Sequence, residues 1–328
     1  MLYIQLPDST PRLLPFYLAM EEYVARKIDA EDSFFMWRVN PTVIFGRNQL
    51  IENEVNVAFC KERGIQTFRR KSGGGCVYAD MGNIMLSYVT KSEQVAFTFG
   101  RYTTMIVYML QKMGIEAQAT GRNDILIDGR KVSGNAFYHI PGHSIVHGTM
   151  LYDTDMYNMV GAITPSTEKL TSKGVDSVRQ HITLVKDHTT MTIDEFMNHI
   201  RTTLCDETLS LTDSDVREIE DIMQEYLTPE FIYGNNPRYT VRRKRRIEGV
   251  GEFEIRMEMK NDVIKDINIM GDFFLTGDIG ANILTPLRGC RLTRESVGEA
   301  LTCEVGEVIH NMTKDMLVSL LTEGQGTP

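Results

Sequence analysis

A cluster of cations and glycines near residue 70 has the composition of an anion-binding loop. Residues 69–71 read Arg-Arg-Lys, Ser72 follows, and residues 73–75 are three glycines. Glycine lets backbone N–H groups approach an anion because no Cβ intervenes, and the cations add mobile charge. A Walker loop is excluded, because that motif places its lysine after the glycines. We predict a phosphate-binding loop; a flexible surface turn is the alternative, and the Asp-x-Gly-Asn turn at 80–83 favours function.

A second set of polar residues surrounds a predicted hairpin. Residues 128–129 are Asp-Gly, a strong two-residue turn signal, so positions whose numbers sum to 257 should lie opposite each other. Asp124 then faces Ser133, and alternation puts Asp124, Lys131, Ser133 and Asn135 on one sheet face. One lysine, one carboxylate and small polar residues on a rigid hairpin suit an anionic ligand. A solvated outer face is the commoner fate of such a pattern.

Two shorter segments carry weaker signals. His147, Gly148 and Thr149 interrupt an apolar strand, and a lone strand histidine is usually structural. Residues 46–49 (Gly-Arg-Asn-Gln) follow a predicted strand, which usually indicates a plain loop. Neither segment alone indicates a function.

Hydrophobic periodicity predicts the elements that position these residues. The helices are expected over residues 15–28, 53–63, 97–113, 193–204 and 214–227, and Gly64 and Gly114 should end two of them. The strands are expected over 34–39, 42–45, 65–68, 84–90, 251–259 and 263–269, with a three-stranded meander over 124–152 and helices closing the chain. Residues 228–249, which include the basic run 242–246, have linker composition. Antiparallel strands with segregated helices predict an α+β fold.

The composition is that of a folded protein with roughly two domains, at about 150 residues each. Of 328 residues, 42% are hydrophobic and 24% are charged, which excludes wholesale disorder. The net charge of −9 disfavours general binding of nucleic acid. Five cysteines without CxxC spacing indicate neither a disulfide framework nor a zinc site. We find no signal-peptide pattern and no apolar stretch of spanning length, so we expect a cytoplasmic protein without a membrane partner.

Together the four segments resemble the lipoate–protein ligase family. Its patterns are a GRNQ loop, RRxSGGGxVxHDxGN, GRNDxxxxGxKxSGxA and HGTxL, and this chain has counterparts at residues 46–49, 69–83, 121–136 and 147–151. The resemblance continues through residues 172–179 and 237–274, where Gly-Asp-Phe-Phe at 271–274 is typical of the family's C-terminal domain. It covers nearly the whole chain, and chance recurrence of all four patterns is implausible.

The resemblance implies a fold, a domain division and a reaction. The implied fold is an α+β, antiparallel or mixed-sheet catalytic domain of the biotin and lipoate ligase type over residues 1–240, with a small C-terminal α+β domain over 247–328. The implied enzyme uses ATP and Mg²⁺ to convert lipoate to lipoyl-AMP, releases pyrophosphate, and then lipoylates a specific lysine. The implied acceptors are lipoyl domains of 2-oxoacid dehydrogenase complexes and the glycine-cleavage carrier protein, and octanoate is an alternative acid.

The resemblance also implies residue roles. Lys131 is the catalytic lysine, which would bond the α-phosphate and the carbonyl oxygen as a point charge, and Asp124 would position the nucleotide and magnesium. The other implied binding residues are Arg47, Arg70, Ser72, Gly73, Gly74, Gly75, Val77, Asn83, Asn123, Ser133, Ala136, His147, Gly148 and Thr149. Among them, the glycine loop and Arg70 would cradle the phosphate and the lipoate carboxylate, while residues near 46–48 and 147–149 would line the acyl tunnel.

Two positions depart from the family pattern. Ala79 stands where the family usually has a histidine, so we do not expect a base or donor there to be essential. His181 replaces an arginine, which should weaken an anion contact.

The sequence disfavours three alternatives to a ligase. An octanoyl- or lipoyl-transferase needs a nucleophilic cysteine, which residues 121–129 lack, and Cys76 is interpreted as a packing residue. A biotin ligase would have a GRGRxGR-like loop, which is absent. A non-catalytic lipoate-binding protein is disfavoured because Lys131, Arg70 and the triple glycine are all retained.

Overall fold

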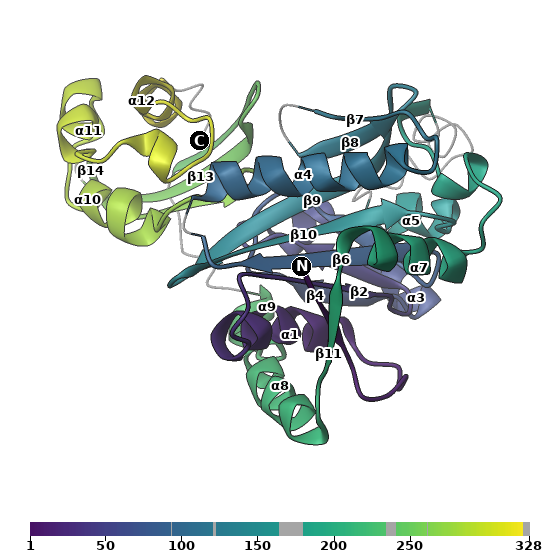
Figure 1. The fold of residues 1–328 in the computed structure, drawn as a ribbon. Helices are drawn as coiled ribbons and strands as arrows, with labels where there is room; N and C mark the ends of the chain where they lie inside the picture. Colours follow the sequence, from purple (N-terminus) through teal and green to yellow (C-terminus); the bar gives the residue numbers. More distant parts are fainter. Residues whose placement is uncertain (93, 121–122, 164–179, 234–240, 261, 324–328) are drawn as a thin grey trace. The chain divides into compact units, whose positions relative to one another are not determined.

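The computed structural model describes residues 1–328 apart from 93, 121–122, 164–179, 234–240, 261 and 324–328 (Figure 1). The chain forms two compact units. The first comprises Met1–Phe45, Ile51–Arg70 and Cys76–Ile232, and the second comprises Gly46–Leu50, Lys71–Gly75 and Tyr233–Pro328. Two loops from the N-terminal half of the chain therefore belong with the C-terminal unit. In the part of the chain that is described, no helix has the length and hydropathy that a membrane span requires.

An eight-stranded sheet forms the centre of the first unit, and its strand order is β11-β1-β2-β6-β10-β9-β8-β7. The strands are β1 Leu2–Gln5, β2 Asp32–Trp37, β6 Asn83–Thr90, β7 Ala117–Ala119, β8 Asp124–Ile127, β9 Arg130–Ile140, β10 His143–Leu151 and β11 Glu207–Ser210. Strand β1 is parallel to both of its neighbours, and the other pairs are antiparallel. The predicted meander is confirmed as β8, β9 and β10, and the sheet is mixed.

A separate three-stranded sheet includes the strands that precede and follow the glycine motif in the sequence. Its order is β4-β3-β5, with β3 Thr42–Phe45, β4 Gln66–Arg69 and β5 Val77–Ala79. The turn predicted around residues 81–83 joins strands of different sheets, because β5 pairs with β3 whereas β6 pairs with β2 and β10. Gly82 makes this crossing possible, since a Cβ there would lie 2.1 Å from the backbone oxygen of Asp153.

The predicted helices of the first unit are largely confirmed. They are α1 Leu14–Lys27, α2 Ile51–Glu54, α3 Val57–Arg63, α4 Val95–Gln111, α5 Met156–Ala162, the 3-10 turn Val185–Asp187, α7 Ile193–Leu204, α8 Asp213–Tyr226 and α9 Pro229–Tyr233. The helix expected over 53–63 is instead two helices, because the Asn56 side chain caps α3 by accepting from the Phe59 N–H. Gly64 ends α3 at a φ of 65°, as predicted.

Helices α1 and α4 cover opposite faces of the large sheet (Figure 1). Consecutive residues of β10 demonstrate the two faces. His147 reaches Glu21 of α1, whereas a Cβ on Gly148 would lie 2.9 Å from the hydroxyl of Tyr102 in α4. Apolar residues of α1 such as Tyr17 and Met20 are buried in one continuous core with the sheet. The position of a β10 side chain in the sequence therefore decides which helix it meets.

The second unit is built on the antiparallel sheet β12-β13-β14, with β12 Val241–Ile247, β13 Gly251–Lys260 and β14 Val263–Gly271. Its helical elements are the π-turn Gly280–Leu284, α10 Thr285–Leu287, α11 Arg294–Ala300, the 3-10 turn Val305–Glu307 and α12 Lys314–Thr322. Phe253 and Phe273 stack in its core with ring centroids 4.6 Å apart. The predicted strands and closing helices are confirmed.

The basic run 242–246 is a strand and not a linker. It forms most of β12, in which Lys244 lies opposite Glu254 and Arg246 lies opposite Glu252. Ion pairs join Arg242 to Glu254 at 2.9 Å and Lys244 to Glu252 at 2.8 Å. The linker expectation was wrong here because acidic residues of β13 neutralise the run, which local composition does not reveal.

Candidate active site

The hairpin of β8 and β9 brings the predicted lysine and aspartate together. The Lys131 Nζ lies 2.7 Å from the Asp124 Oδ1, and the two side chains are 38% and 30% exposed. Leu126 lies opposite Lys131 as the turn rule predicts. A bulge then shifts the register, so that Asp124 faces Gly134 and not Ser133. The predicted pairing was wrong there because β9 contains one residue more than the rule allows.

The bulge also divides the four residues that were expected on one face. A Cβ on Gly134 would lie 2.7 Å from the Lys131 Nζ and 3.7 Å from the Asp124 Oδ1, so these three positions share a face. Asn135 points to the other face, because a Cβ on Gly148 would meet its Oδ1 at 1.8 Å.

Ser133 belongs with Asn135 on that second face. It is fully buried, and its hydroxyl lies 3.3 Å from the Asn135 Oδ1. Lys131 and Asp124, with the Lys131 side chain lying over Gly134, therefore form the polar surface of the hairpin, and Ser133 and Asn135 lie on the opposite face.

Asn123 is tied to Asn135 across the hairpin. The Asn123 backbone oxygen accepts from the Asn135 N–H at 2.9 Å and from the Asn135 Nδ2 at 3.0 Å, and the Asn123 Nδ2 donates to the Asn135 oxygen at 3.2 Å. These bonds fix Asn123, which immediately precedes Asp124 at the start of β8. Residues 121–122 of the same motif lie outside the described residues, as do 172–179.

A segment that the motif analysis did not assign to the site reaches the backbone of Lys131. Ile182 forms an isolated parallel bridge with Lys131, and the Thr183 N–H donates to the Lys131 oxygen at 2.9 Å. His181, which departs from the family pattern, precedes this bridge and is exposed. The substituted position is therefore next in sequence to a direct contact with the candidate catalytic residue.

His147 occupies a buried polar network. Its Nδ1 lies 2.9 Å from the Glu21 Oε2, and Ser87 donates to the other carboxylate oxygen at 2.6 Å. Glu21 and His147 are 0% and 6% exposed. This geometry matches the structural interpretation of a strand histidine, and sequence reasoning missed Glu21. The available signal was a carboxylate within the apolar stripe of the first helix.

Thr149 and Ala136 lie on the same face as the lysine. Thr149 is hydrogen-bonded to the backbone of Gly134, which donates to its Oγ1 at 3.3 Å. Ala136 lies opposite His147 and is buried. Gly148 differs from these residues, since a Cβ there would point toward α4 and meet the Tyr102 hydroxyl at 2.9 Å. The HGT motif therefore serves both faces of the sheet.

The glycine loop and the GRNQ loop lie together in the second unit. The Arg47 N–H donates to the Ser72 oxygen at 2.9 Å, and the Gly46 N–H donates to the Gln49 Oε1 at 2.7 Å. The Gly74 N–H donates to the Phe273 oxygen at 3.1 Å, with Gly74 at a φ of 82°.

The same contact restricts the neighbouring glycine. A Cβ on Gly73 would lie 2.4 Å from the Phe273 oxygen, whereas Gly75 has open space around it. Only a residue without a side chain permits such a close backbone approach. Ser72, in the same loop, is fully buried.

Arg70 and Cys76, which adjoin the glycine loop in the sequence, belong to the first unit. The Arg70 Nη1 donates to the Ile44 oxygen at 3.1 Å, and burial lowers the pKa of its guanidinium to about 10, so it stays charged at neutral pH. Burial raises the pKa of the Cys76 thiol well above its ordinary value. A nucleophilic cysteine needs the opposite shift, which supports the interpretation of Cys76 as a packing residue. Val77 continues into β5 and is half-buried.

Asn83 begins β6 with its side chain fully buried. Its Nδ2 donates to the Tyr78 oxygen at 3.1 Å, while its Oδ1 has no hydrogen-bond partner among the described residues. Asp80 fixes the preceding turn by accepting from the backbone N–H of Gly82 and of Asp155, at 2.9 Å and 2.8 Å. Burial raises the pKa of Asp80. Ala79, at the departure from the family pattern, is buried in β5.

The donor set suits a magnesium ion that arrives with a nucleotide. The described residues contain no group of three or more His, Cys, Asp or Glu side chains that could hold a metal alone. Magnesium needs only one or two protein carboxylates when phosphates and waters complete its octahedron. The half-buried carboxylate of Asp124 meets that requirement.

Two family models match the chain. Residues 15–205 match the lipoyl protein ligase A/B catalytic domain, and residues 236–321 match the bacterial lipoate protein ligase C-terminus. Lipoate-protein ligase LplJ of Bacillus subtilis is 33% identical over 93% of this chain and 95% of its own length. Lipoate–protein ligase 1 of Staphylococcus aureus is 36% identical over 87% of this chain and 89% of its own.

Solved structures share the fold. LipL1 of P. falciparum, solved in complex with lipoate, has a TM-score of 0.80 at 19% identity and covers 99% of this chain and 100% of its own. A bipartite ligase of Thermoplasma acidophilum, studied with its E2 lipoyl domain, has a TM-score of 0.64 at 26% identity over 73% of this chain and 98% of its own. A lipoate-protein ligase A bound with ATP has a TM-score of 0.61 at 24% identity over 71% and 98%.

Proposed function

The chain belongs to the lipoate–protein ligase family, and from this premise we propose that it attaches lipoate to a protein lysine in two ATP-dependent half-reactions. First, a carboxylate oxygen of lipoate attacks the α-phosphate of ATP, forming lipoyl-AMP and releasing pyrophosphate. Second, the lysine amine of the acceptor attacks the lipoyl carbonyl, AMP leaves, and the amine loses a proton. Adenylation is needed because a free carboxylate is a poor acyl donor.

The observation that carries this proposal is the Lys131–Asp124 pair, whose lysine lies over Gly134, a residue without a side chain. Adenylation brings two anions together, so a positive charge must screen them and align them. The Lys131 ammonium lies at the surface of the hairpin. It can lie over Gly134 because that residue has no side chain. We assign it to the α-phosphate and carbonyl oxygens, where it acts by its charge and not as a nucleophile.

We assign the anion-binding backbone to Ser72, Gly73, Gly74 and Gly75, with Arg47 and Arg70 as the cations. The left-handed φ of 82° at Gly74 is a backbone conformation that anion-binding nests use. In this structure the Gly74 N–H is occupied by the Phe273 oxygen. A phosphate that takes this donor must replace that contact.

Asp124 would hold magnesium, and Asn83 and Asn123 would position the nucleotide. Magnesium would neutralise phosphate charge, which is the chemistry it supplies when bound. The buried Asn83 Oδ1, which has no partner among the described residues, is consistent with a polar ligand nearby.

The acyl chain needs apolar walls, which we assign to Val77 and Ala136. His147 and Thr149 border Ala136 on the same face, where the network around Glu21 fixes the histidine ring. We therefore assign His147, Gly148 and Thr149 to positioning the walls rather than to acid–base chemistry.

We propose a catalytic domain over about residues 1–240 and a small accessory domain that follows it, with β12 as its first strand. We propose lipoyl domains of 2-oxoacid dehydrogenase complexes and the glycine-cleavage carrier protein as acceptors. The five cysteines are free thiols, which fits a reducing, cytoplasmic compartment.

The deciding experiment incubates a lipoyl domain with the enzyme, ATP, magnesium and lipoate, and follows the mass of the domain. The expected result is a mass increase of one lipoyl group that requires every component. Lipoate-dependent exchange of pyrophosphate into ATP tests the first half-reaction separately. Absence of exchange with both lipoate and octanoate contradicts the proposal.

A further inference from the structure

The Lys131 end of β9 is paired on both of its edges, and the second partner there is not β10. The ladder between β9 and β10 ends where Asn135 lies opposite Gly148, while β8 continues along β9 to the hairpin turn. Ile182 forms its parallel bridge with Lys131, and the Thr183 N–H donates to the Lys131 oxygen at 2.9 Å. Because a strand has two edges, this short segment occupies the edge that β10 has left.

His188 holds Thr183 from the other side. The Thr183 Oγ1 lies 2.8 Å from the His188 Nε2. The 3-10 turn Val185–Asp187 brings the two residues together, since the His188 N–H donates to the Val185 oxygen at 2.9 Å. Thr183 and the His188 side chain are only 2% and 17% exposed, so water competes little for their contact. The side chain of Thr183 is therefore fixed by a histidine five residues further along the chain.

The turn that carries His188 is fixed to the chain that follows β10. The Lys186 N–H donates to the Tyr152 oxygen at 3.2 Å, and the Lys186 Nζ lies 2.7 Å from the Asp153 Oδ2. These contacts hold the turn without help from the β8–β9 hairpin. They give His188 a fixed position from which it holds Thr183.

We propose that His188 is a positioning residue for the Lys131 ammonium and acts through Thr183, an inference that rests on the proposed function. The Lys131 side chain lies over Gly134, with its Nζ 2.7 Å from Asp124, so its place depends on the backbone of residue 131. Loss of the His188 contact frees Thr183 to move, and the Lys131 oxygen then loses a fixed donor. Since a displacement of about 1 Å can cost about 10²-fold in rate, a partial loss of order should cost less than that.

The test measures kcat and KM of lipoate-dependent pyrophosphate exchange in His188→Ala and His188→Gln. We expect His188→Ala to lower kcat about tenfold, the factor that one well-placed hydrogen bond can supply. The KM values for ATP and lipoate should change less than twofold. His188→Gln should restore kcat to within threefold of the wild type, because its amide can replace the Nε2 contact. A kcat of His188→Ala within twofold of the wild type would overturn the proposal.

Thr183→Val tests the same contact from its other partner. Valine keeps the backbone N–H and the shape of the side chain and removes only the hydroxyl. Its kcat should fall as in His188→Ala, and the double variant should fall no further. Losses that multiply would show that the two side chains act separately, which contradicts the proposal.

Amide hydrogen exchange follows the positioning directly and needs no activity. The Thr183 N–H should exchange faster in His188→Ala than in the wild type, as measured by mass spectrometry of the peptide that contains it. A lower kcat with unchanged protection of this N–H would assign the effect of His188 to another contact and overturn the proposal.

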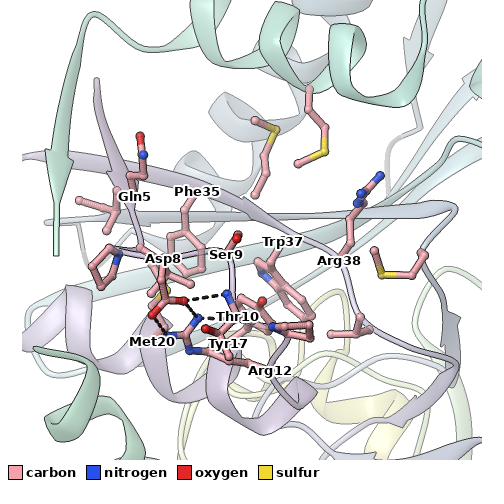
Figure 2. A pocket seen from close by; sticks show the side chains of 18 of the residues that line it. Gln5, Asp8, Ser9, Thr10, Arg12, Tyr17, Met20, Phe35, Trp37 and Arg38 are labelled. Carbon is pink, nitrogen blue, oxygen red and sulfur yellow. Dashed lines mark hydrogen bonds and ion pairs between the residues drawn. The ribbon is translucent and has the colours of Figure 1, made fainter. Parts of the chain in front are cut away.

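Residues 8–12 provide a control of the same kind (Figure 2). They border a cavity of about 670 Å³ beside β1 and β2, and both carboxylate oxygens of Asp8 accept from Arg12, at 2.8 Å and 2.9 Å. None of these residues is assigned to the ligase reaction. Asp8→Asn should therefore keep kcat within twofold of the wild type, as should His139→Ala, which changes an exposed histidine of β9.

The outcomes separate this inference from the proposed function. A wild type without lipoate-dependent exchange contradicts the proposed function. An active wild type whose kcat is unchanged in His188→Ala contradicts only the role of His188.

Discussion

Replacing Gly134 by alanine tests whether the position of the Lys131 ammonium, and not merely its charge, supports catalysis. The new Cβ would lie 2.7 Å from the Lys131 Nζ and 2.8 Å from its Cε. Non-bonded carbon contacts have their optimum at about 3.5–4.0 Å. The ammonium must therefore move by roughly 1 Å, and a displacement of about 1 Å from productive geometry can cost about 10²-fold in rate.

The same substitution should leave the fold intact. Gly134 is not among the glycines with positive φ, so alanine meets no backbone strain. The atoms that must move are the end of a flexible, half-exposed side chain. Alanine also restricts the unfolded chain, which stabilises a compatible site by about 0.4–1 kcal/mol. The half-exposed Lys131–Asp124 pair contributes at most about 1 kcal/mol, so the two effects nearly cancel.

The measurement compares the rate of lipoate-dependent pyrophosphate exchange with the midpoint of thermal unfolding. We expect exchange to fall about 10²-fold in Gly134→Ala while the midpoint changes by a few degrees at most. Gly100→Ala is the control, because a Cβ at this exposed position of α4 meets nothing within 4 Å. A Gly134→Ala enzyme within threefold of wild-type activity would refute the assignment of the reaction to this surface.

Three further predictions concern other groups. Lys131→Ala should reduce adenylate formation at least about 10²–10³-fold and change the thermal midpoint little, because its ion pair is half-exposed. Cys76→Ser should keep nearly the full lipoylation rate, and an inactive variant would indicate a thioester route. Glu254 is buried, which raises its pKa, but hydrogen bonds from Arg242 and Arg256 outweigh burial and lower it below the ordinary 4.5. Its contribution to stability should therefore be present above pH 4.5 and lost as the pH falls through the lowered pKa, and Glu254→Gln should abolish this part of the acid dependence in denaturant titrations.

Long amphipathic helices and the central meander could be predicted from the sequence, because their signals are local. Helices α1, α4, α7 and α8 each repeat apolar residues over several turns. The strands β1, β7 and β11 were missed, since each has three or four residues and little periodicity. Strand β1 also pairs with β11 some two hundred positions away, and no local pattern encodes such a partner.

The pairing within the β8–β9 hairpin could be predicted only in part from the turn rule. The turn rule holds at Leu126 and Lys131, next to the turn, and fails beyond the bulge in β9. The buried side chain of Val132 accounts for the extra residue, because it must reach the core while Lys131 stays at the surface. Whether β9 takes up an extra residue therefore depends on which side chains pack against the hairpin, and the turn residues do not encode this. The role of Glu21 could not be predicted from local sequence either, because its partner His147 lies on a different element of the fold.

The half-exposed state of the Lys131–Asp124 pair matters for the chemistry proposed. A deeply buried pair would exchange partners at high cost, because separating it leaves a desolvated charge. A pair in contact with solvent is worth about 1 kcal/mol or less, so an incoming phosphate can displace the carboxylate from the lysine. Until then the carboxylate aims the ammonium at the space beside Gly134. In the proposed reaction Asp124 would orient the lysine in the free enzyme and would become available to magnesium once a phosphate takes its place on the lysine, which links the two roles proposed for one side chain.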